Sequence, residues 1–509
     1  MHLILALLAC VVAPTCSDGG GSRGGPISGT RSGTDNNLAD APPVATLGRP
    51  PIVLIVFDAL HAGHVGHLGY ERDTTPNLDA IAAEGVSFSS AFAPAPYTLA
   101  SIPSLLTGRR PDTHGVTSSG ARLGDEETTL AEICARSGYR TLAAVGNFNG
   151  GERTGASQGF ETFREMFRDP EFSGSSSDAA PDAGLRLATA DMFVDFTSEE
   201  LGRLDSAQPL FLYLHILEPH APYVMPDEYR DLWLDPDYDG PFATGATQPF
   251  IDSLSGKLTV GERDTEAGRA LYDGNLRWAD HTLGLLRAQL EAAGLWDEAL
   301  VIVTSDHGEA FWQHGRWGHN DHLFDEQLHV PLVVKLPAGR GLRGVVRDDL
   351  VSLLDVTPSI CEWLDVAPGM LPLDGHSLAA LTEDASWKPT GRELFLRTHQ
   401  AIANLALRTA STKTIVERGP KRGDKPWGHV VRTQHFDLVQ DGGELHDLYA
   451  SRQAPADADA ARLLEWGQEA IRNRNERGTG LTPGEVALLR GLGYVDVPPA
   501  FETQADDEH

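Results

Sequence analysis

Two aspartates and a histidine in this sequence have the types and positions of a metal site. Asp58 directly follows the apolar run Ile52–Phe57, and Asp306 with His307 closes the run that begins at Leu300. If both runs are buried strands of an open α/β sheet, the three side chains lie beyond the carboxyl ends, where such sheets bind ligands. Two carboxylates and an imidazole are suitable donors for a divalent metal. One aspartate at a strand end is more often a turn residue, but two of them favour the metal site.

A threonine supplies a group that can attack a substrate. Thr98 lies just before a predicted short helix, in which the early Pro103 needs no N–H partner. A helix start favours negative charge, and a hydroxyl that is also bound to a metal can lose its proton and act as a nucleophile. Without the neighbouring metal ligands, Thr98 would be interpreted as an ordinary helix N-cap.

Several other polar residues have two interpretations each. Asn147 follows a predicted strand and is either a substrate contact or, more commonly, a turn residue. Among the histidines around Asp306, we expect His314 to bind substrate. Three histidines recur at intervals of three residues, which suggests either a second metal site or, preferably, a solvated loop; they are His61, His64 and His67.

The segments between these residues alternate between predicted strands and helices. Further buried strands are predicted at Thr141–Gly146, Leu210–Leu214 and Pro331–Leu336. A helix begins at Thr75 and Pro76 and runs to Glu84, and an amphipathic helix spans residues 275–293. This alternation predicts an α/β fold, with a doubly wound, mainly parallel sheet and helices on both faces.

The pattern changes after about residue 385, where short strand candidates follow one another without long helices. They are Arg392–Arg397, Leu405–Ala410, Thr412–Glu417 and His435–Val439. We therefore predict a small C-terminal α+β subdomain with an antiparallel sheet. The predicted division of the chain is a leader at 1–16, a flexible linker at 17–48, a catalytic domain at 49–385, and a C-terminal subdomain and tail at 386–509. Residues 166–182 and 235–262 are predicted surface loops.

The N-terminus resembles an export signal. Leu3–Val12 is an apolar run that is too short to span a bilayer but suits a signal peptide. A cysteine and a Gly/Ser-rich tether follow it, as in a bacterial lipoprotein leader, which would make Cys16 the lipidated residue. Cys10 is the alternative, and the absence of Lys or Arg before the run argues against either site. We expect export to the cell envelope, in the periplasm or on the outer surface, with a lipid anchor to the membrane.

Composition excludes several classes of protein. The 509 residues include 41 Lys+Arg and 72 Asp+Glu, a formal net charge of −31, which argues against nucleic-acid binding because that binding is driven by basic side chains. One small anionic substrate is still compatible, since a metal outweighs a distant field. Only four cysteines are present, so a disulfide scaffold is excluded, and we expect Cys134 and Cys361 to be two thiols rather than a bridge.

Ordered sequence blocks over most of the chain resemble the sulfatase family of the alkaline-phosphatase superfamily. The blocks are IVLIVFDALHAGHVGHLGY, TTPNLDAIAAEGVSFSSAFAPAPYTLASIPSLLTGRRPDTHGV, LHILEPHAPY, VIVTSDHGEAFWQHGRWGHNDHLFDEQLHVPLVV and LVSLLDVTPSICEWL. The resemblance implies the predicted sheet, the small C-terminal subdomain, and cleavage of sulfate or phosphate esters at a metal.

The resemblance also implies roles for single residues. Asp58 matches the family's first metal aspartate, and Asp306 with His307 matches its late metal pair. Thr98 stands nine residues before Thr107-Gly108, at the nucleophile's position. Two histidines match residues that contact the ester oxygens or the leaving group; they are His220 and His319, the latter placed where lipid-linked phosphotransferases of the superfamily carry a substrate histidine.

Departures from the family pattern point to a different nucleophile. Sulfatases carry a Cys or Ser that is oxidised to formylglycine, with an Arg four residues later; here the two positions hold Thr98 and Ile102. Ala59 replaces the second early metal aspartate. The chain therefore resembles the branch of the superfamily in which a threonine attacks directly, which includes phosphoryl transferases and phosphodiesterases. We expect phosphate esters to be preferred over sulfate esters.

The expected mechanism uses one divalent metal. Asp58, Asp306, His307 and the Thr98 oxygen hold it, a set that favours Zn²⁺ or Mn²⁺ over Ca²⁺ or Mg²⁺. Thr98 attacks in line, and His220 or His319 protonates the leaving group. The substrate-binding residues are then His220, His319, His314 and Asn147. Two alternatives to a hydrolase are a transferase that moves a phosphoryl-linked group to a lipid or glycan acceptor, and a catalytically silent binding protein of the same fold.

Overall fold

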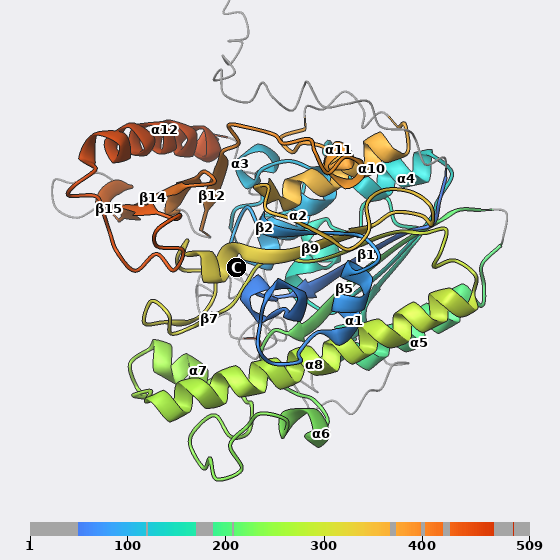
Figure 1. Ribbon diagram of the computed structural model, residues 1–509, viewed down its shortest axis with the longest axis horizontal. Coiled ribbons are helices and arrows are strands. Elements are labelled where there is room, and N and C mark those ends of the chain that lie inside the picture. The colour runs from blue at the N-terminus through green and yellow to red at the C-terminus, as the bar shows by residue number, and fades with distance from the viewer. Residues whose placement is uncertain are drawn as a thin grey trace, which may run out of the picture.

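The computed structural model describes residues 49–118, 121–168, 187–205, 208–366, 373–398, 403–420, 428–472 and 492. The predicted leader with Cys10 and Cys16, the linker, and most of the predicted loop at 166–182 lie outside these residues. Figure 1 shows a central sheet between two layers of helices, with a smaller sheet at one end.

The central sheet has nine strands, eight of them in the order β10-β2-β9-β6-β1-β5-β3-β4, with β11 also paired to β2. β9 is antiparallel to both of its neighbours, and every other pair is parallel. The strands are β1 (Ile52–Asp58), β2 (Val86–Phe92), β3 (Arg140–Val145), β4 (Thr162–Glu165), β5 (Leu210–Pro219), β6 (Leu300–Ser305), β9 (His329–Lys335), β10 (Val345–Arg347) and β11 (Val351–Ser352). A two-stranded hairpin, β7 (Ala310–Phe311) and β8 (Trp317–Gly318), follows β6.

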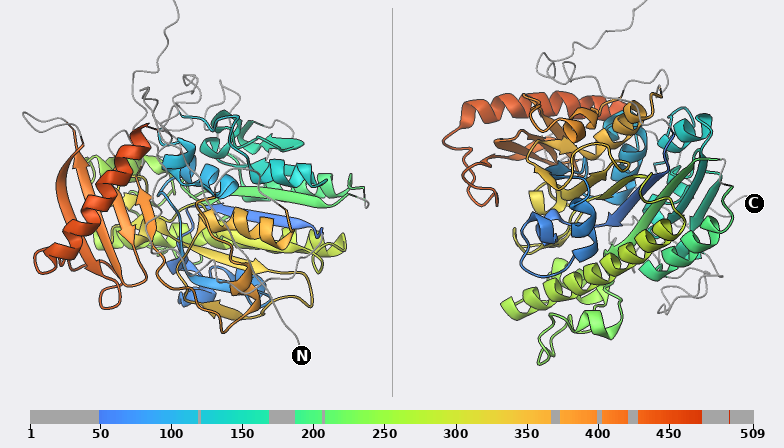
Figure 2. Two further views of the ribbon diagram at one scale, coloured as in Figure 1. Left: turned by 90° about the horizontal axis from the view of Figure 1, so that it is seen from above. Right: turned by 45° about the vertical axis from the view of Figure 1, so that its right-hand side comes forward.

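Helices cover both faces of this sheet (Figures 1 and 2). One face packs against α1 (Pro76–Ala82), α5 (Ala190–Leu201) and α8 (Glu262–Ala292). The other packs against α2 (Thr98–Thr107), α4 (Leu130–Arg136), α10 (Val356–Trp363) and α11 (Ala379–Glu383). The remaining short helices are α3 (Pro111–His114), α6 (Asp227–Arg230), α7 (Thr247–Leu254) and α9 (Asp325–Leu328).

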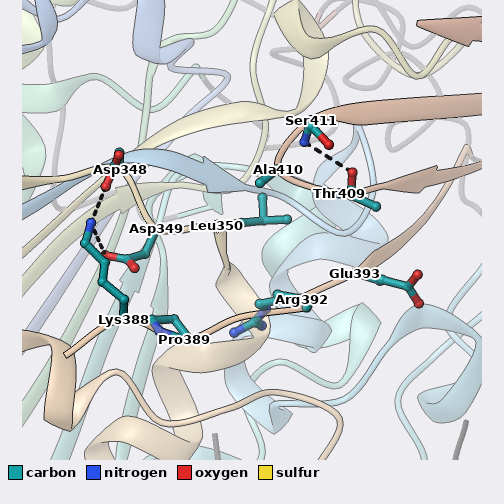
Figure 3. A pocket seen from close by; sticks show the side chains of 11 residues that line it. Asp348, Asp349, Leu350, Lys388, Pro389, Arg392, Glu393, Thr409, Ala410 and Ser411 are labelled. Carbon is teal, nitrogen blue, oxygen red and sulfur yellow. Dashed lines mark hydrogen bonds and ion pairs between the residues drawn. The ribbon is translucent and has the colours of Figure 1, made fainter. Parts of the chain in front are cut away.

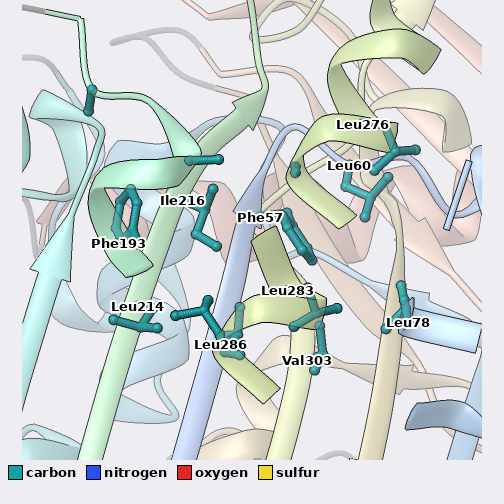
Figure 4. Packing of buried hydrophobic residues seen from close by; sticks show 14 of the residues in the cluster. Phe57, Leu60, Leu78, Phe193, Leu214, Ile216, Leu276, Leu283, Leu286 and Val303 are labelled. Carbon is teal, nitrogen blue, oxygen red and sulfur yellow. The ribbon is translucent and has the colours of Figure 1, made fainter. Parts of the chain in front are cut away.

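β1 shows why the sequence forms a sheet that is buried on both sides. All seven of its residues are buried. Alternate side chains point to opposite faces of a strand, so Phe57 packs with Leu283 and Leu286 of α8 while Val56 packs in the opposite layer. Figure 4 shows Phe57 beside these leucines of α8. A continuous apolar run is therefore needed here, as expected for a parallel strand covered on both faces.

The smaller sheet is antiparallel and has the order β12-β13-β14-β15. Its elements are β12 (Leu394–Arg397), β13 (Leu405–Arg408), β14 (Thr412–Gly419), β15 (His429–Asp437) and the helix α12 (Gln453–Arg472). Leu463 and Trp466 of α12 cover one face of this sheet. On the other face, Ile415 and Phe436 pack with Leu328 of the larger part.

The predicted fold class is confirmed, with three local differences. β9 was predicted as a buried strand of the mainly parallel sheet, and it runs antiparallel to both of its neighbours, a direction that its apolar run does not specify. The amphipathic helix begins at Glu262 rather than at residue 275, since its more polar first half still buries Leu271 and Tyr272. The predicted loop at 235–262 contains α7. Cys134 and Cys361 are free buried thiols, as expected.

None of the described helices combines the length and apolar character needed to cross a membrane.

The end of β5 carries a buried carboxyl group. Glu218 is 3% exposed, and its Oε1 accepts a 2.9 Å hydrogen bond from the backbone N–H of Ala190 at the start of α5. Burial raises the pKa of Glu218 to about 8. The folded chain therefore keeps a proton on this group in a pH range where the unfolded chain has lost it.

We expect Glu218→Gln to weaken the pH dependence of stability. Between about pH 4.5 and 8 the folded state binds more protons at Glu218 than the unfolded state, so stability falls as pH rises through that window. Glutamine stays neutral throughout. Unfolding midpoints at pH 5.5, 7 and 8.5 should fall less in the variant than in the wild type, and equal slopes would contradict the assignment.

Two leucines of α8 test the core. Leu283 is 1% exposed and Leu285 is 40% exposed, two positions apart on the same helix. Leu283→Ala should lower the free energy of unfolding by about 2–5 kcal/mol because it leaves a cavity against the sheet. Leu285→Ala, the matched control, should change it by less than about 0.5 kcal/mol. Denaturant unfolding of both variants measures the difference, and similar costs would contradict the packing.

Candidate active site and metal centre

Three side chains that can bind a metal meet where β1 and β6 end. Asp58, Asp306 and His307 each offer a ligand atom within 4.8 Å of the others, and all three are fully buried. His307 Nε2 lies 3.5 Å from Asp58 Oδ1 and 3.5 Å from Asp306 Oδ2. Because β1 and β6 are parallel neighbours, their carboxyl ends place these residues side by side. Within the described part of the chain this is the one such cluster of three.

Hydrogen bonds orient both carboxylates. Asp306 Oδ1 accepts from the backbone N–H groups of Ala59 at 3.2 Å and His307 at 2.9 Å. Asp58 Oδ2 accepts from Asn147 Nδ2 at 2.5 Å. In each group the second oxygen, Asp58 Oδ1 or Asp306 Oδ2, has no hydrogen-bond partner. One oxygen of each carboxylate is therefore fixed and the other faces His307.

His307 and Thr98 complete the set of donors. The Nδ1 of His307 lies 2.9 Å from the Gly308 carbonyl oxygen, which requires a proton on Nδ1 and leaves a lone pair on Nε2. Thr98 Oγ1 lies 3.3 Å from this Nε2 and 3.5 Å from Asn147 Nδ2. Thr98 is the first residue of α2 rather than the residue before it, and Tyr97 occupies the N-cap position. The buried hydroxyl of Thr98 therefore lies beside the possible metal ligands.

Without a cation, the charges of the two carboxylates, Asp58 and Asp306, are not balanced. Burial, followed by the charge of Asp58, raises the pKa of Asp306 well above its ordinary value. Burial also raises the pKa of Asp58, but the charge interactions with His220, His215 and His307 outweigh it, so that the pKa is lowered overall. A divalent cation between the two carboxylates would offset their repulsion.

The donor atoms also fit the size of a metal. Tetrahedral sites with metal–ligand distances of about 2.0–2.1 Å have donor atoms about 3.3–3.4 Å apart. The contacts of His307 Nε2 with Thr98, Asp58 and Asp306 are 3.3, 3.5 and 3.5 Å. With two carboxylate oxygens, one imidazole nitrogen and one hydroxyl, the residues present fit a divalent metal.

A second pair of histidines lies beside this centre. The ring of His319 is 4.2 Å from the ring of His307 and 4.9 Å from that of His220. His319 Nδ1 contacts Glu309 Oε1 at 3.1 Å, and the two residues flank the β7–β8 hairpin. Burial lowers the pKa of His319, but the charge of Glu309 outweighs it and raises the pKa overall. Burial lowers the pKa of His220, whose Nδ1 contacts the Ala221 carbonyl oxygen at 2.5 Å.

The structure brings most of the predicted site residues together, but not all of them. Asn147 is a turn residue, because its Oδ1 accepts from the Asn149 N–H, and its Nδ2 binds Asp58; its contact with substrate stays a prediction. His314 is engaged elsewhere: its Nδ1 lies 2.7 Å from Glu326 and its ring stacks on Phe324 at 3.6 Å.

The three regularly spaced histidines do not form a second metal site among the described residues. His64 pairs with Asp273 at 2.6 Å, and His67 with Asp79 at 2.8 Å. His61 lines a separate cavity of about 350 Å³. These contacts give His64 and His67 structural roles, but His64 is buried and not part of the solvated loop that the sequence favoured.

Three residues at the metal centre were not predicted from the sequence. Glu309 could have been found from its place two residues after His307. Ala59 adopts a positive φ of 64°, which directs its N–H to Asp306, and sequence alone gives no sign of this. His215 is a fully buried imidazole in β5, and the signal was a polar residue inside an apolar strand.

A larger cavity, of about 540 Å³, lies beside the small sheet (Figure 3). Charged side chains in its lining form ion pairs with other residues of the protein: Lys388 binds Asp348 at 2.6 Å, and Arg392 binds Asp355 at 2.6 Å. The metal-binding cluster of Asp58, Asp306 and His307 is therefore the better candidate for the active site.

Comparisons with known proteins identify the family of this chain. The profile of the sulfatase family matches residues 50–366. An arylsulfatase of Clostridium perfringens is 25% identical over 500 residues, which cover 87% of this chain and 98% of the relative. The multifunctional alkaline phosphatase superfamily protein PehA of Trinickia caryophylli is 28% identical over 65% of this chain and 76% of its own.

Solved structures share the fold. The phosphonate monoester hydrolase of Agrobacterium radiobacter superposes with a TM-score of 0.63 at 22% identity, over 83% of this chain and 96% of that one. The family match spans the sheet, both carboxylates, Thr98 and the histidine pair. The chain belongs to the sulfatase family and is an ester hydrolase of the alkaline-phosphatase superfamily.

Proposed function

We propose that this chain hydrolyses phosphate or sulfate esters with Thr98 as the nucleophile at one divalent-metal site. The observation that carries the proposal is the contact between the Thr98 hydroxyl and the metal-binding cluster, 3.3 Å from His307 Nε2. The hydroxyl lies at the start of α2, where a developing negative charge is favoured. The position that would carry a formylglycine precursor holds a threonine.

The bound metal would supply Lewis-acid stabilisation of charge on the transferred group and on the attacking oxygen. Asp58, Asp306, His307 and Thr98 would hold it, and the imidazole donor favours Zn²⁺ or Mn²⁺ over Ca²⁺ or Mg²⁺. The Thr98 hydroxyl gives its proton to solvent water, and its oxygen attacks phosphorus or sulfur in line with the leaving oxygen. The ester bond breaks, and its electron pair leaves on the alcohol oxygen, which takes a proton.

The two outer histidines are suited to different parts of this reaction. His319 has a raised pKa beside Glu309 and is the better proton donor to the leaving oxygen. His220 has a lowered pKa and is neutral, so it is suited to contact the ester oxygens. Water then attacks the Thr98 ester, which releases phosphate or sulfate and restores the hydroxyl. Groups with pKa values pushed apart are a common way to divide such roles.

Phosphate esters are the proposed preference. A formylglycine hydrate can expel sulfate without attack of water on sulfur, whereas a threonine ester must be hydrolysed at the central atom. Such hydrolysis is well suited to phosphoryl groups. Names of relatives include both a sulfatase and a phosphonate monoester hydrolase, so the family accommodates either choice.

Export to the cell envelope is proposed on the sequence alone. The apolar run Leu3–Val12 and the Gly/Ser-rich tether after Cys16 support a signal peptide with a lipid anchor. Substrates would then be met outside the cytoplasm.

Substitution of Thr98 tests the nucleophile. Thr98→Ala should lower kcat/KM by about 10³-fold or more, because no other hydroxyl replaces the attacking oxygen, while Thr98→Ser should keep measurable activity. Matched aryl sulfate, phosphate monoester and phosphate diester substrates, assayed with Zn²⁺ and with Mn²⁺, give the comparison. Thr107→Ala, which removes a buried hydroxyl at the far end of α2, is the control and should stay active.

Retained activity in Thr98→Ala would refute the direct mechanism. Fastest turnover of the aryl sulfate would refute the preference for phosphate esters. The activities of Thr98→Ala and Thr98→Ser would then still decide whether Thr98 is the nucleophile.

Metal removal should destabilise the protein. Dialysis against a chelator leaves Asp58 and Asp306 facing each other without a cation, so the melting temperature should fall, and Zn²⁺ or Mn²⁺ should restore it more than Ca²⁺ or Mg²⁺. Saturation at about 100 times Kd corresponds to about 2.7 kcal/mol of added stability. Asp306→Ala should not respond to metal. An equal response of wild type and Asp306→Ala would contradict the site.

A further inference from the structure

A buried imidazole lies beneath the metal centre without an assigned role. His215 stands in the middle of β5, beside Val56 of β1 and Val145 of β3 in the sheet. It is fully buried. Its Nε2 is 3.4 Å from Asp58 Oδ2 and 3.8 Å from Asp306 Oδ2. No other strand of the described sheet places an imidazole between these two carboxylates.

The ring has no hydrogen-bond partner at normal distance. Neither Nδ1 nor Nε2 of His215 makes one, although a buried polar group without a partner is costly and rare in folded proteins. The backbone closes over the Nδ1 side, because a Cβ on Gly150 would stand 2.6 Å from Nδ1. The Nε2 side faces the two metal-binding carboxylates.

The position of Asn147 indicates whether His215 binds the metal or orients the Asp58 carboxylate. Asn147 Nδ2 binds Asp58 Oδ2, the same oxygen that His215 faces. The other oxygen, Asp58 Oδ1, faces His307. His215 and His307 therefore approach different oxygens of the Asp58 carboxylate, and His215 is placed to hold that group rather than to join the donors gathered around His307.

We propose that His215 is a positioning residue of the metal centre: its Nε2–H donates to Asp58 Oδ2 and, together with Asn147, fixes Oδ1 toward the metal. This inference rests on the proposed function, because it presupposes the metal. A donor behind a ligating carboxylate fixes its rotation, and loss of such a partner typically costs 10–100-fold in metal affinity.

Metal affinity of His215 variants tests the proposal. His215→Leu removes the donor at similar volume, and His215→Gln keeps an N–H group on a side chain of similar reach. Zn²⁺ dissociation constants, measured by chelator competition, should rise about 10–100-fold for His215→Leu and less than about 10-fold for His215→Gln. Tyr213→Phe is the matched control, because it removes a buried polar atom from the same strand and face and should leave the affinity unchanged.

Absorption spectra with Co²⁺ separate positioning from ligation. A positioning residue leaves the ligand set intact, so the Co²⁺ spectra of His215→Gln and wild type should agree. A changed spectrum would make His215 a direct ligand and overturn the proposal, as would a Zn²⁺ affinity of His215→Leu equal to that of wild type. If His215→Leu does not fold, His215→Asn replaces it: its shorter amide should lose affinity relative to His215→Gln, and equal values would overturn the proposal. Absence of Zn²⁺ binding by the wild type would instead refute the metal centre itself.

Discussion

The repulsion between two buried carboxylates is the constraint on which the site depends. Asp58 and Asp306 face each other with both side chains fully buried, and the basic side chains that approach them within 3.5 Å are the imidazoles of His215 and His307. Neighbouring parallel strands bring them there, and backbone N–H groups hold one oxygen of Asp306. A cation bound between the two carboxylates would be attracted by both charges and would offset their repulsion.

The turn after Asp58 shows how much local structure this arrangement requires. Ala59 has a positive φ of 64°, a conformation that costs a side chain of the L configuration roughly 1 kcal/mol. The Tyr272 hydroxyl donates to the Ala59 carbonyl at 2.7 Å, and the Ser305 hydroxyl accepts from Leu60 N–H at 2.7 Å. These bonds hold the turn in the form that aims the Ala59 N–H at Asp306. A residue that departs from the family pattern in side chain therefore still serves the centre through its backbone.

Sequence predicted most of what local patterns determine. The apolar runs gave β1 and β6, and the aspartates that follow them marked the correct edge of the sheet. The direction of β9 was not predictable from its apolar run, because strand direction depends on the connection and not on composition. His314 and His319 were both predicted to bind substrate, yet the ring of His314 stacks on Phe324 while that of His319 lies 4.2 Å from the ring of His307. Such choices are made by tertiary packing, which spacing along the chain does not encode.

The small sheet contributes to the centre through the segment between β6 and β9. This segment carries Glu309 and His319 and ends in α9, where Asp325 binds Lys413 of β14 at 2.7 Å and Arg408 of β13 at 3.1 Å. Lys413 is fully buried and also contacts Glu444 at 2.8 Å, so its charge is compensated by two carboxylates within the protein. The ion pairs thus fix the far end of the segment while the metal-binding cluster fixes its beginning. Between two fixed ends, the position of His319 beside His307 follows from the fold.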